Sequence, residues 1–263
     1  FDMANNSLNT YNQAGAVYGS YTGSPTPAAY FHSGADYDIR IGALYMNWIN
    51  EFGSLIAGRT PFQFGLGMTF NAGAGAFDHW LTLKDMVGYK IALGNITFMP
   101  AAAKTHSSIF TTQTDINELM FVAEYANPES DLSMGIIYNT HSAAPDLNNS
   151  IGFFGANAQG QAAYNTYNMN LYVKKKTENF NVGVELGFLN GDPGVRDITN
   201  SNHFDFSGFG LATEFGYRLG DITLNLKAGL ASGDDTSTSR FEGFYFNPNY
   251  EVGMLMFSQP LGQ

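Results

Sequence analysis

The side chains best suited to acid–base chemistry in this sequence are its histidines, and Asp78-His79 is the most suggestive pair. A carboxylate beside an imidazole can help to activate water or a hydroxyl nucleophile. Adjacent residues on an extended chain point to opposite faces, however, so these two side chains are poorly placed to act together. The five histidines all fall in or beside segments that we expect to be surface loops: His32, His79, His106, His141 and His203.

Other catalytic chemistries find no support in the sequence. It contains no G-x-S-x-G sequence and no histidine-containing metal motif, and the absence of cysteine excludes thiolate nucleophiles and ligands. Two acidic turn segments, 190–193 (NGDP) and 232–235 (SGDD), could bind Ca²⁺, but neither has EF-hand spacing. We therefore expect solvated loops at these positions, no catalytic residue, no metal site and no cofactor. A hydrolase stays an alternative.

The remaining charged residues are mostly single charges within segments of alternating polarity. The clearest segment is 180–188, where Phe, Val, Val, Leu and Phe alternate with Asn, Gly, Glu and Gly. Period-two alternation predicts a β-strand with one apolar and one polar face. We expect about eleven such strands in all. The others cover 37–49, 55–60, 87–93, 95–98, 118–125, 132–139, 166–174, 209–218, 222–230 and 250–257.

The composition indicates where such strands would be stable. Charged residues make up only 13% of the chain and aromatic residues 15%, so a soluble surface would be short of charge. No apolar run approaches the roughly 18–20 residues that a transmembrane helix needs. Backbone polar groups in a bilayer need internal partners, which leaves a closed barrel as the spanning structure. A soluble β-sandwich would also alternate, but its outward face should carry more charge.

The connections between the predicted strands alternate between short and long. Short, turn-like links fall at 50–53, 94–95, 127–131, 175–179 and 219–221, and long ones at about 61–85, 105–115, 140–163, 190–203 and 232–245. Outer-membrane barrels have short periplasmic turns and longer extracellular loops. The sequence therefore predicts an all-β fold, a transmembrane antiparallel up-and-down β-barrel, over a single domain that spans 1–263.

This orientation also leads to an expectation about the ends of the chain. Residues 1–36 would form an extracellular loop, and the first and last predicted strands would both run towards the periplasm. Bacterial single-chain barrels have even strand numbers, so we expect one or more terminal strands to be missing. An intact barrel of about 14–18 strands could enclose an aqueous channel.

Strand parity predicts which charged side chains would line that channel. A charge at the lipid face costs up to about 2–4 kcal/mol at mid-membrane, so charges on polar faces should point inward. Arg59 is included although it shares parity with Leu55 and Ala57 near a strand end, and Glu214 and Lys227 could instead pair and hold the wall together. The predicted pore-lining residues are Arg40, Arg59, Lys90, Glu118, Glu124, Glu185, Glu214, Arg218 and Lys227.

Two further features bear on the predicted barrel. The loop that begins at 61–68 (PFQFGLGM) is apolar and glycine-rich, so it could fold into the lumen and narrow the pore, or pack on the rim or against a neighbouring subunit. Trp48, Trp80 and the many tyrosines and phenylalanines near strand ends suit the aromatic girdles at membrane interfaces. Lys174-Lys175-Lys176 at a short turn is expected to be a solvated charge run.

The segment 58–65 (GRTPFQFG), which follows a strand and a tight turn, is similar to the G-R-x-x-x-x-x-G element of alginate-export-like and related porin families. Asp234-Asp235, followed by 241–246 and a strand, is loosely similar to a late loop of the same group. In architecture the whole chain resembles Gram-negative outer-membrane porins as a class. This resemblance implies a bacterial outer-membrane location and passive transport without a cofactor.

Two functions follow as expectations. The first is a channel for diffusion of small hydrophilic solutes, and the second is a structural or assembly barrel plugged by its loops or by a partner in an envelope complex. Expected partners are the lipid bilayer, lipopolysaccharide, small solutes, and a protein partner or further copies of the chain. The net charge of −11 argues against nucleic acid, because phosphate binding needs clustered Lys and Arg.

Overall fold

The computed structural model describes residues 43–74, 82–105, 116–143, 158–160, 163–197, 205–235, 238, 240–247 and 249–250. All regular elements in these ranges are β-strands. No helix among the described residues is long and apolar enough to cross a membrane. Arg40, Trp80, the predicted loop over 1–36 and all of the predicted last strand except Tyr250 lie outside the described residues.

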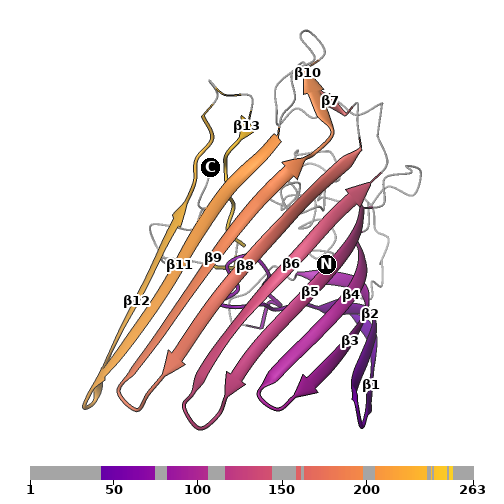
Figure 1. The fold of residues 1–263 in the computed structure, drawn as a ribbon. Helices are drawn as coiled ribbons and strands as arrows, with labels where there is room; N and C mark the ends of the chain where they lie inside the picture. Colours follow the sequence, from indigo (N-terminus) through magenta and orange to yellow (C-terminus); the bar gives the residue numbers. More distant parts are fainter. Residues whose placement is uncertain are drawn as a thin grey trace, which may run out of the picture.

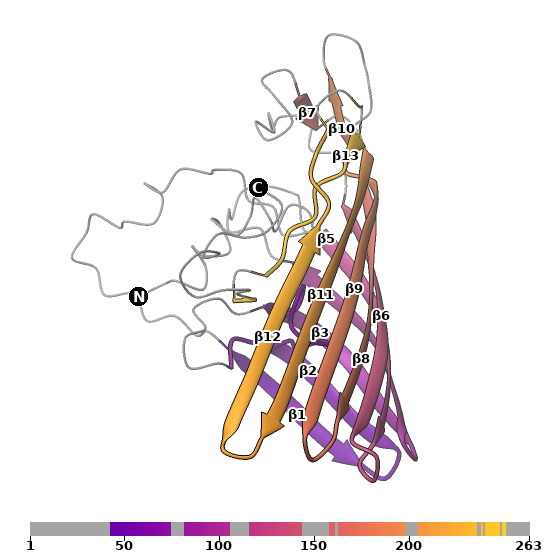
Figure 2. The same cartoon turned by 90° about the vertical axis from the view of Figure 1, so that its left-hand side faces the viewer.

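Ten long strands form one antiparallel, up-and-down sheet in which each strand pairs with the next long strand along the chain (Figure 1). They are β1 (Leu44–Asn50), β2 (Gly53–Pro61), β3 (Leu83–Leu93), β4 (Ile96–Thr105), β5 (Ile116–Asn127), β6 (Leu132–Ala143), β8 (Tyr164–Lys176), β9 (Phe180–Asp192), β11 (Asp205–Leu219) and β12 (Ile222–Ala231). The sheet is strongly curved (Figure 2). Among the described residues it is open, with β1 and β12 at its two edges.

Three short strands lie outside this path. β7 (Ala158–Gly160) and β10 (Val195–Asp197) pair with each other in a separate two-stranded sheet. β13 (Arg240–Phe241) runs parallel to the start of β11. None of these was predicted from the sequence, because two or three residues carry too little alternation to be distinguished from a loop.

The five short links all lie at one end of the sheet, the lower end in Figure 1, and the strand ends that lead into the long connections lie at the other. The turns contain residues with positive φ: Gly94 and Gly220 both have φ of +60°, and Asp131 has φ of +48°. Glycine takes this left-handed conformation without the steric cost of a Cβ atom, and aspartate tolerates it. The predicted alternation of short and long links is therefore confirmed for the described strands.

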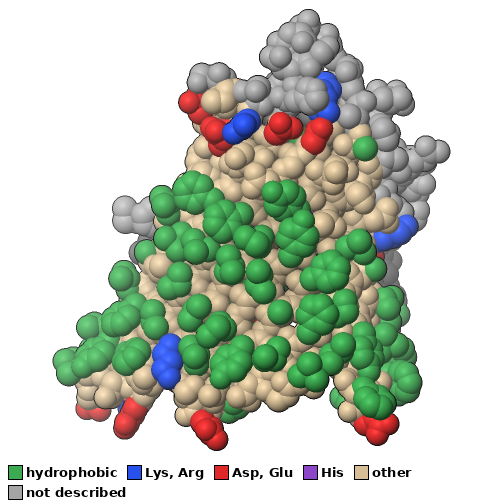
Figure 3. Space-filling view, viewed as in Figure 1, with side chains coloured by type: hydrophobic (Ala, Val, Ile, Leu, Met, Phe, Trp, Pro, Cys, Tyr) green, Lys and Arg blue, Asp and Glu red, His purple; other side chains and the backbone are tan. Residues whose placement is uncertain are grey.

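The register confirms the predicted alternation of polar and apolar faces. Leu186 pairs laterally with Leu171 and with Leu211, so apolar side chains form continuous rows across the strands. These rows form the outer, convex face of the sheet. Large apolar side chains on it stay exposed, from 36% for Leu171 to 68% for Leu44. Figure 3 shows a belt of hydrophobic side chains across this face, with most charged side chains above and below it.

Several strands extend further than predicted. β4 continues through Pro100 to Thr105, whereas the alternation in the sequence ends at Phe98. Proline has no N–H to donate, so it is tolerated in a sheet only where the ladder does not need one. The register of β4 with β3 pairs Phe98 with Ile91 and Ala101 with Gly88 but skips Met99 and Pro100. An interrupted ladder at this point thus accommodates the proline.

Candidate functional site on the inner face

The inner, concave face of the sheet is covered by chain from the long connections. Residues 62–74, which follow β2, lie against it and bury the side chains of Phe62, Phe64, Met68 and Phe70. A second segment, 241–250, buries Phe244, Phe246 and Tyr250 on the same face. We call the described residues of these two segments the inner plug. The apolar loop after β2 was expected to fold inward or to pack on the rim or a neighbouring subunit. Its described residues fold inward, against the concave face of the sheet.

The first segment is attached to the sheet through a buried carboxylate. Glu185 on β9 accepts hydrogen bonds at Oε2 from the backbone N–H groups of Leu66 (2.7 Å) and Met68 (3.3 Å). Its Oε1 accepts from Asn170 Nδ2 at 2.9 Å. Asn170 Nδ2 also donates to Thr69 Oγ1 at 2.7 Å. Two backbone N–H groups of the plug therefore converge on one side chain of the sheet, so Glu185 anchors Leu66 and Met68 to the inner face.

The second segment is held by the first, by Thr82 just before β3 and by Ser232 just after β12. The N–H of Asn247 donates to the carbonyl of Met68 at 2.6 Å, and Asn247 Nδ2 donates to Thr82 Oγ1 at 3.3 Å. The N–H of Phe244 donates to the carbonyl of Ser232 at 2.9 Å. The two parts of the plug therefore support each other, although they are far apart in the sequence.

Glycines on the inner face leave room for the plug. A Cβ atom at Gly210 would lie 2.4 Å from a ring carbon of Phe244, and one at Gly187 would lie 2.6 Å from the same ring. A Cβ atom at Gly183 would lie 2.7 Å from a methyl carbon of Leu66. Real Cβ contacts are not this short, so β9 and β11 accept the plug only because these positions lack side chains.

We expect Gly210→Val to displace Phe244 and Phe246 from the inner face. Forcing extra carbon atoms into a packed site typically costs about 1–3 kcal/mol. Hydrogen exchange of the peptide that contains 241–247 should therefore become faster in the variant. Gly233→Ala is the matched control, because a Cβ atom there meets nothing within 4 Å. Unchanged exchange in Gly210→Val would show that Phe244 does not occupy this position.

A band of buried polar side chains runs across the inner face beside the plug. Lys84 on β3 forms an ion pair with Glu118 on β5, and both side chains are almost fully buried. Glu118 Oε2 also accepts from Asn139 Nδ2 on β6 at 3.0 Å. His141 Nε2 lies 3.1 Å from Asn139 Nδ2 and 3.9 Å from Glu118 Oε2. Removing only one partner of such a buried charge pair strongly destabilises a protein, because the other charge stays buried without compensation.

His141 was expected to be a surface-loop histidine, and this prediction was wrong. It lies within β6, is fully buried and faces the polar band. The alternation in the sequence appeared to end at Asn139, but the strand continues to Ala143. Lys84 was missed for a similar reason, because the predicted strand began at residue 87. Lys84 is separated from Met86, Gly88 and Lys90 by even numbers of residues, and this spacing could have placed it on the inner face.

Most of the predicted pore-lining residues share the inner-face parity. Glu118 and Glu185 are buried there, and the others are at least partly accessible. Glu214 on β11 pairs with Lys227 on β12 at 2.9 Å, as the alternative for these two residues anticipated. The residues with inner-face register are Lys90, Glu118, Glu124, Glu185, Glu214, Arg218 and Lys227.

Arg59 occupies the opposite parity. It stands directly across from Asp85 on β3, and its guanidinium binds that carboxylate with two N–O distances of 2.7 Å. On β2 it alternates with Gly58 and Thr60, which share the inner-face register, and it therefore lies on the outer-face side near the end with the long connections. The ion pair between Arg59 and Asp85 compensates both of their charges on the outer-face side.

In the acidic segment 190–193, the carboxylate of Asp192 is bound by the side chain of Arg196. Both carboxylate oxygens of Asp192 accept hydrogen bonds from the Arg196 guanidinium, at 2.8 and 2.7 Å. Asp192 is therefore engaged within the chain. Among the described residues no group of three or more His, Cys, Asp or Glu side chains is placed to hold a metal ion.

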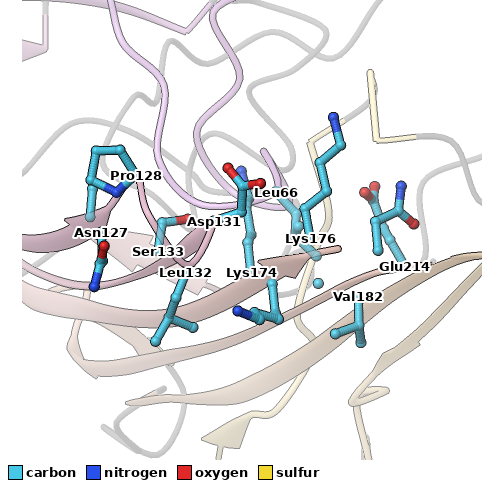
Figure 4. Close-up of a pocket in the computed structure, with 14 residues that line it drawn as sticks. Leu66, Asn127, Pro128, Asp131, Leu132, Ser133, Lys174, Lys176, Val182 and Glu214 are labelled. Carbon is cyan, nitrogen blue, oxygen red and sulfur yellow. The ribbon is translucent and has the colours of Figure 1, made fainter. Parts of the chain in front are cut away.

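A cavity of about 450 Å³ lies on the inner side near the short turns. It is bounded by the β5–β6 turn, the ends of β8 and β9, β11 and the plug residue Leu66. In Figure 4, Lys176 and Glu214 rise from the sheet on one side, whereas Leu132 and Val182 point to the other. Because its lining includes Leu66 and residues beside the short turns, the cavity lies between the plug and the short-turn end of the inner face.

The chain matches no protein-family model and no curated protein.

Proposed function

We propose that this protein is a channel in the bacterial outer membrane for the diffusion of small hydrophilic solutes, with the inner plug as its constriction. The observation that carries the proposal is the exposed apolar chemistry of the outer face of the sheet. Exposed Leu, Val, Ile and Phe form rows on the convex face, whereas the concave face combines Asn, Thr, Glu, Lys and Gly with a buried apolar cluster that packs against the plug. A sheet in water would have the reverse arrangement.

Aromatic side chains on the outer face support the membrane location. Trp48, Phe180 and Tyr217 lie near the short turns and are 39% or more exposed. Towards the long connections, Tyr138 and Tyr167 are exposed with ring centres 5.7 Å apart. Two aromatic zones separated by an aliphatic one match the girdles that anchor barrels at both membrane interfaces. In this proposal the short turns face the periplasm.

In this proposal the open sheet forms part of a closed wall. Barrels satisfy every backbone N–H and C=O between neighbouring strands, which a bilayer requires. The edges at β1 and β12 would therefore be paired in the membrane. Solutes would pass between the wall and the plug.

The test is single-channel recording of the full-length protein in planar bilayers. We expect a stable conductance, and a larger one for Glu185→Gln. Glutamine replaces an acceptor oxygen by an N–H donor, so it cannot keep the bonds from Leu66, Met68 and Asn170 together. Glu51→Gln in the exposed β1–β2 turn is the matched control and should leave the conductance unchanged.

A plugged structural or assembly barrel is the second candidate. The extent of the plug favours it, because aromatic residues of both segments pack in buried clusters against the sheet. A correctly folded protein that gives no conductance, in the wild type and in Glu185→Gln, would support this candidate and contradict the channel. Heat-modifiable migration in gels would confirm that the silent protein is folded.

A further inference from the structure

We propose that the cavity near the short turns is a binding site for small oxyanions, with Lys174 and Lys176 as its cationic groups. This inference rests on the proposed channel only in taking the bound oxyanion as a transported solute, because binding itself is measured on the isolated protein. It names small oxyanions as the solutes that bind on the inner face at the end near the short turns. The sequence alone suggested only a solvated charge run at these lysines.

Two lysines of this run, Lys174 and Lys175, have neutral hydrogen-bond partners in the described part of the chain. Lys174 Nζ donates to the carbonyl oxygen of Gly65 in the plug and lies 5.3 Å from the centre of the Tyr172 ring. Lys175 Nζ donates to the carbonyl of Ser130. No carboxylate among the described residues forms an ion pair with Lys174, Lys175 or Lys176. Lys174 and Lys176 therefore place two ammonium groups on the inner-face side of this wall, and neither forms an ion pair with a described residue.

The acidic groups of the cavity are fewer. Glu214 is already paired with Lys227 at 2.9 Å, and Asp131 is exposed at the β5–β6 turn. Among the residues that line the cavity the lysines therefore outnumber the carboxylates, although the whole chain has a net charge of −11. A concave surface with one sign of charge raises the local concentration of the opposite ion, and low-dielectric walls strengthen the effect.

The shape of the cavity fits a small solute. Its volume of about 450 Å³ lies within the range of small-molecule sites, which is roughly 300–1,000 Å³. Lys174 and Lys176 are two residues apart on β8, so both lie on the inner-face side of that strand. Asn181 on β9 and Ser133 on β6 add neutral polar groups to the lining. Ammonium groups bind phosphate and carboxylate oxygens as point charges.

The test uses inorganic phosphate as the probe. Calorimetric titration of the full-length protein in detergent micelles should detect binding, and Lys176→Gln should weaken it roughly tenfold, the loss of one hydrogen bond to a charged group. Lys90→Gln is the matched control, because Lys90 shares the inner-face register on β3 but does not line the cavity. Succinate should compete with phosphate, whereas glycerol should not.

Two results would overturn the site: no phosphate binding by the folded wild type, or an equal loss in Lys176→Gln and Lys90→Gln. Reversal potentials across a salt gradient separate this inference from the channel itself. A conducting, anion-preferring protein that loses this preference in Lys176→Glu supports both. Conductance with no preference for anions would contradict the site and leave the channel standing. Phosphate binding by a silent protein would contradict the channel alone.

Discussion

Replacing Lys84 by methionine should lower the free energy of unfolding by about 3–5 kcal/mol, the cost of leaving a buried charge without its partner. Lys84 is 5% exposed and Glu118 is 1% exposed, so water cannot take the place of the lost ammonium group. Lys84 also lies 5.4 Å from the centre of the Phe70 ring in the plug, and this contact would be lost as well. Urea unfolding of the refolded protein in micelles would measure the change.

Two further variants assign the loss to the charge pair. Lys90→Met makes the same change on the same strand and face at an exposed position, and it should have little effect. The double variant Lys84→Met with Glu118→Gln should recover much of the stability, because glutamine is neutral and can still accept from Asn139. A double variant as unstable as Lys84→Met alone would contradict the account of an uncompensated carboxylate.

Leu186→Arg should destabilise the protein in a lipid bilayer by about 2–4 kcal/mol, the cost of arginine at the lipid-facing midplane of a barrel. Leu186 lies in the middle of β9, between Leu171 and Leu211 on the outer face, and is 37% exposed. Unfolding in lipid vesicles would measure the change. The prediction is specific to a membrane, because an arginine on a sheet exposed to water would cost little.

Leu219→Arg is the depth control for this prediction. Leu219 ends β11 at a short turn and is 60% exposed, so the same substitution should cost only about 0–1 kcal/mol near the interface. Equal effects at both positions would count against a bilayer around the outer face. A larger effect at Leu219 would contradict the proposed depth of the strands.

The position of the plug could not be derived from local pattern. Residues 61–68 are apolar where a solvated loop should be polar, and this indicated only that they need a partner. The partner is Glu185, which is 119 residues from Leu66 in the sequence. Alternation placed Glu185 on the polar face, but it could not distinguish a charge in open water from one that binds a loop. Gly183, Gly187 and Gly210 were likewise visible only as small residues on that face.

The Arg59 position shows the limit of parity at a strand end. Its sequence parity with Leu55 and Ala57 agreed with the outer-face side, yet its charge favoured the inner one. The ion pair with Asp85 resolves this conflict, and it depends on the register between β2 and β3. A register is a property of two strands together, and no pattern within one of them determines it.

The sequence by itself determined the central parts of the long strands, the apolar character of their outer face and the end at which the short turns gather. These properties follow from period-two alternation and turn residues, which act over a few neighbouring positions. Only the tertiary structure decided what lies against the inner face. The plug, the Lys84–Glu118 pair, the buried His141 and the cavity beside Lys176 all depend on contacts between distant segments. Such contacts form only when the curved sheet brings those segments together.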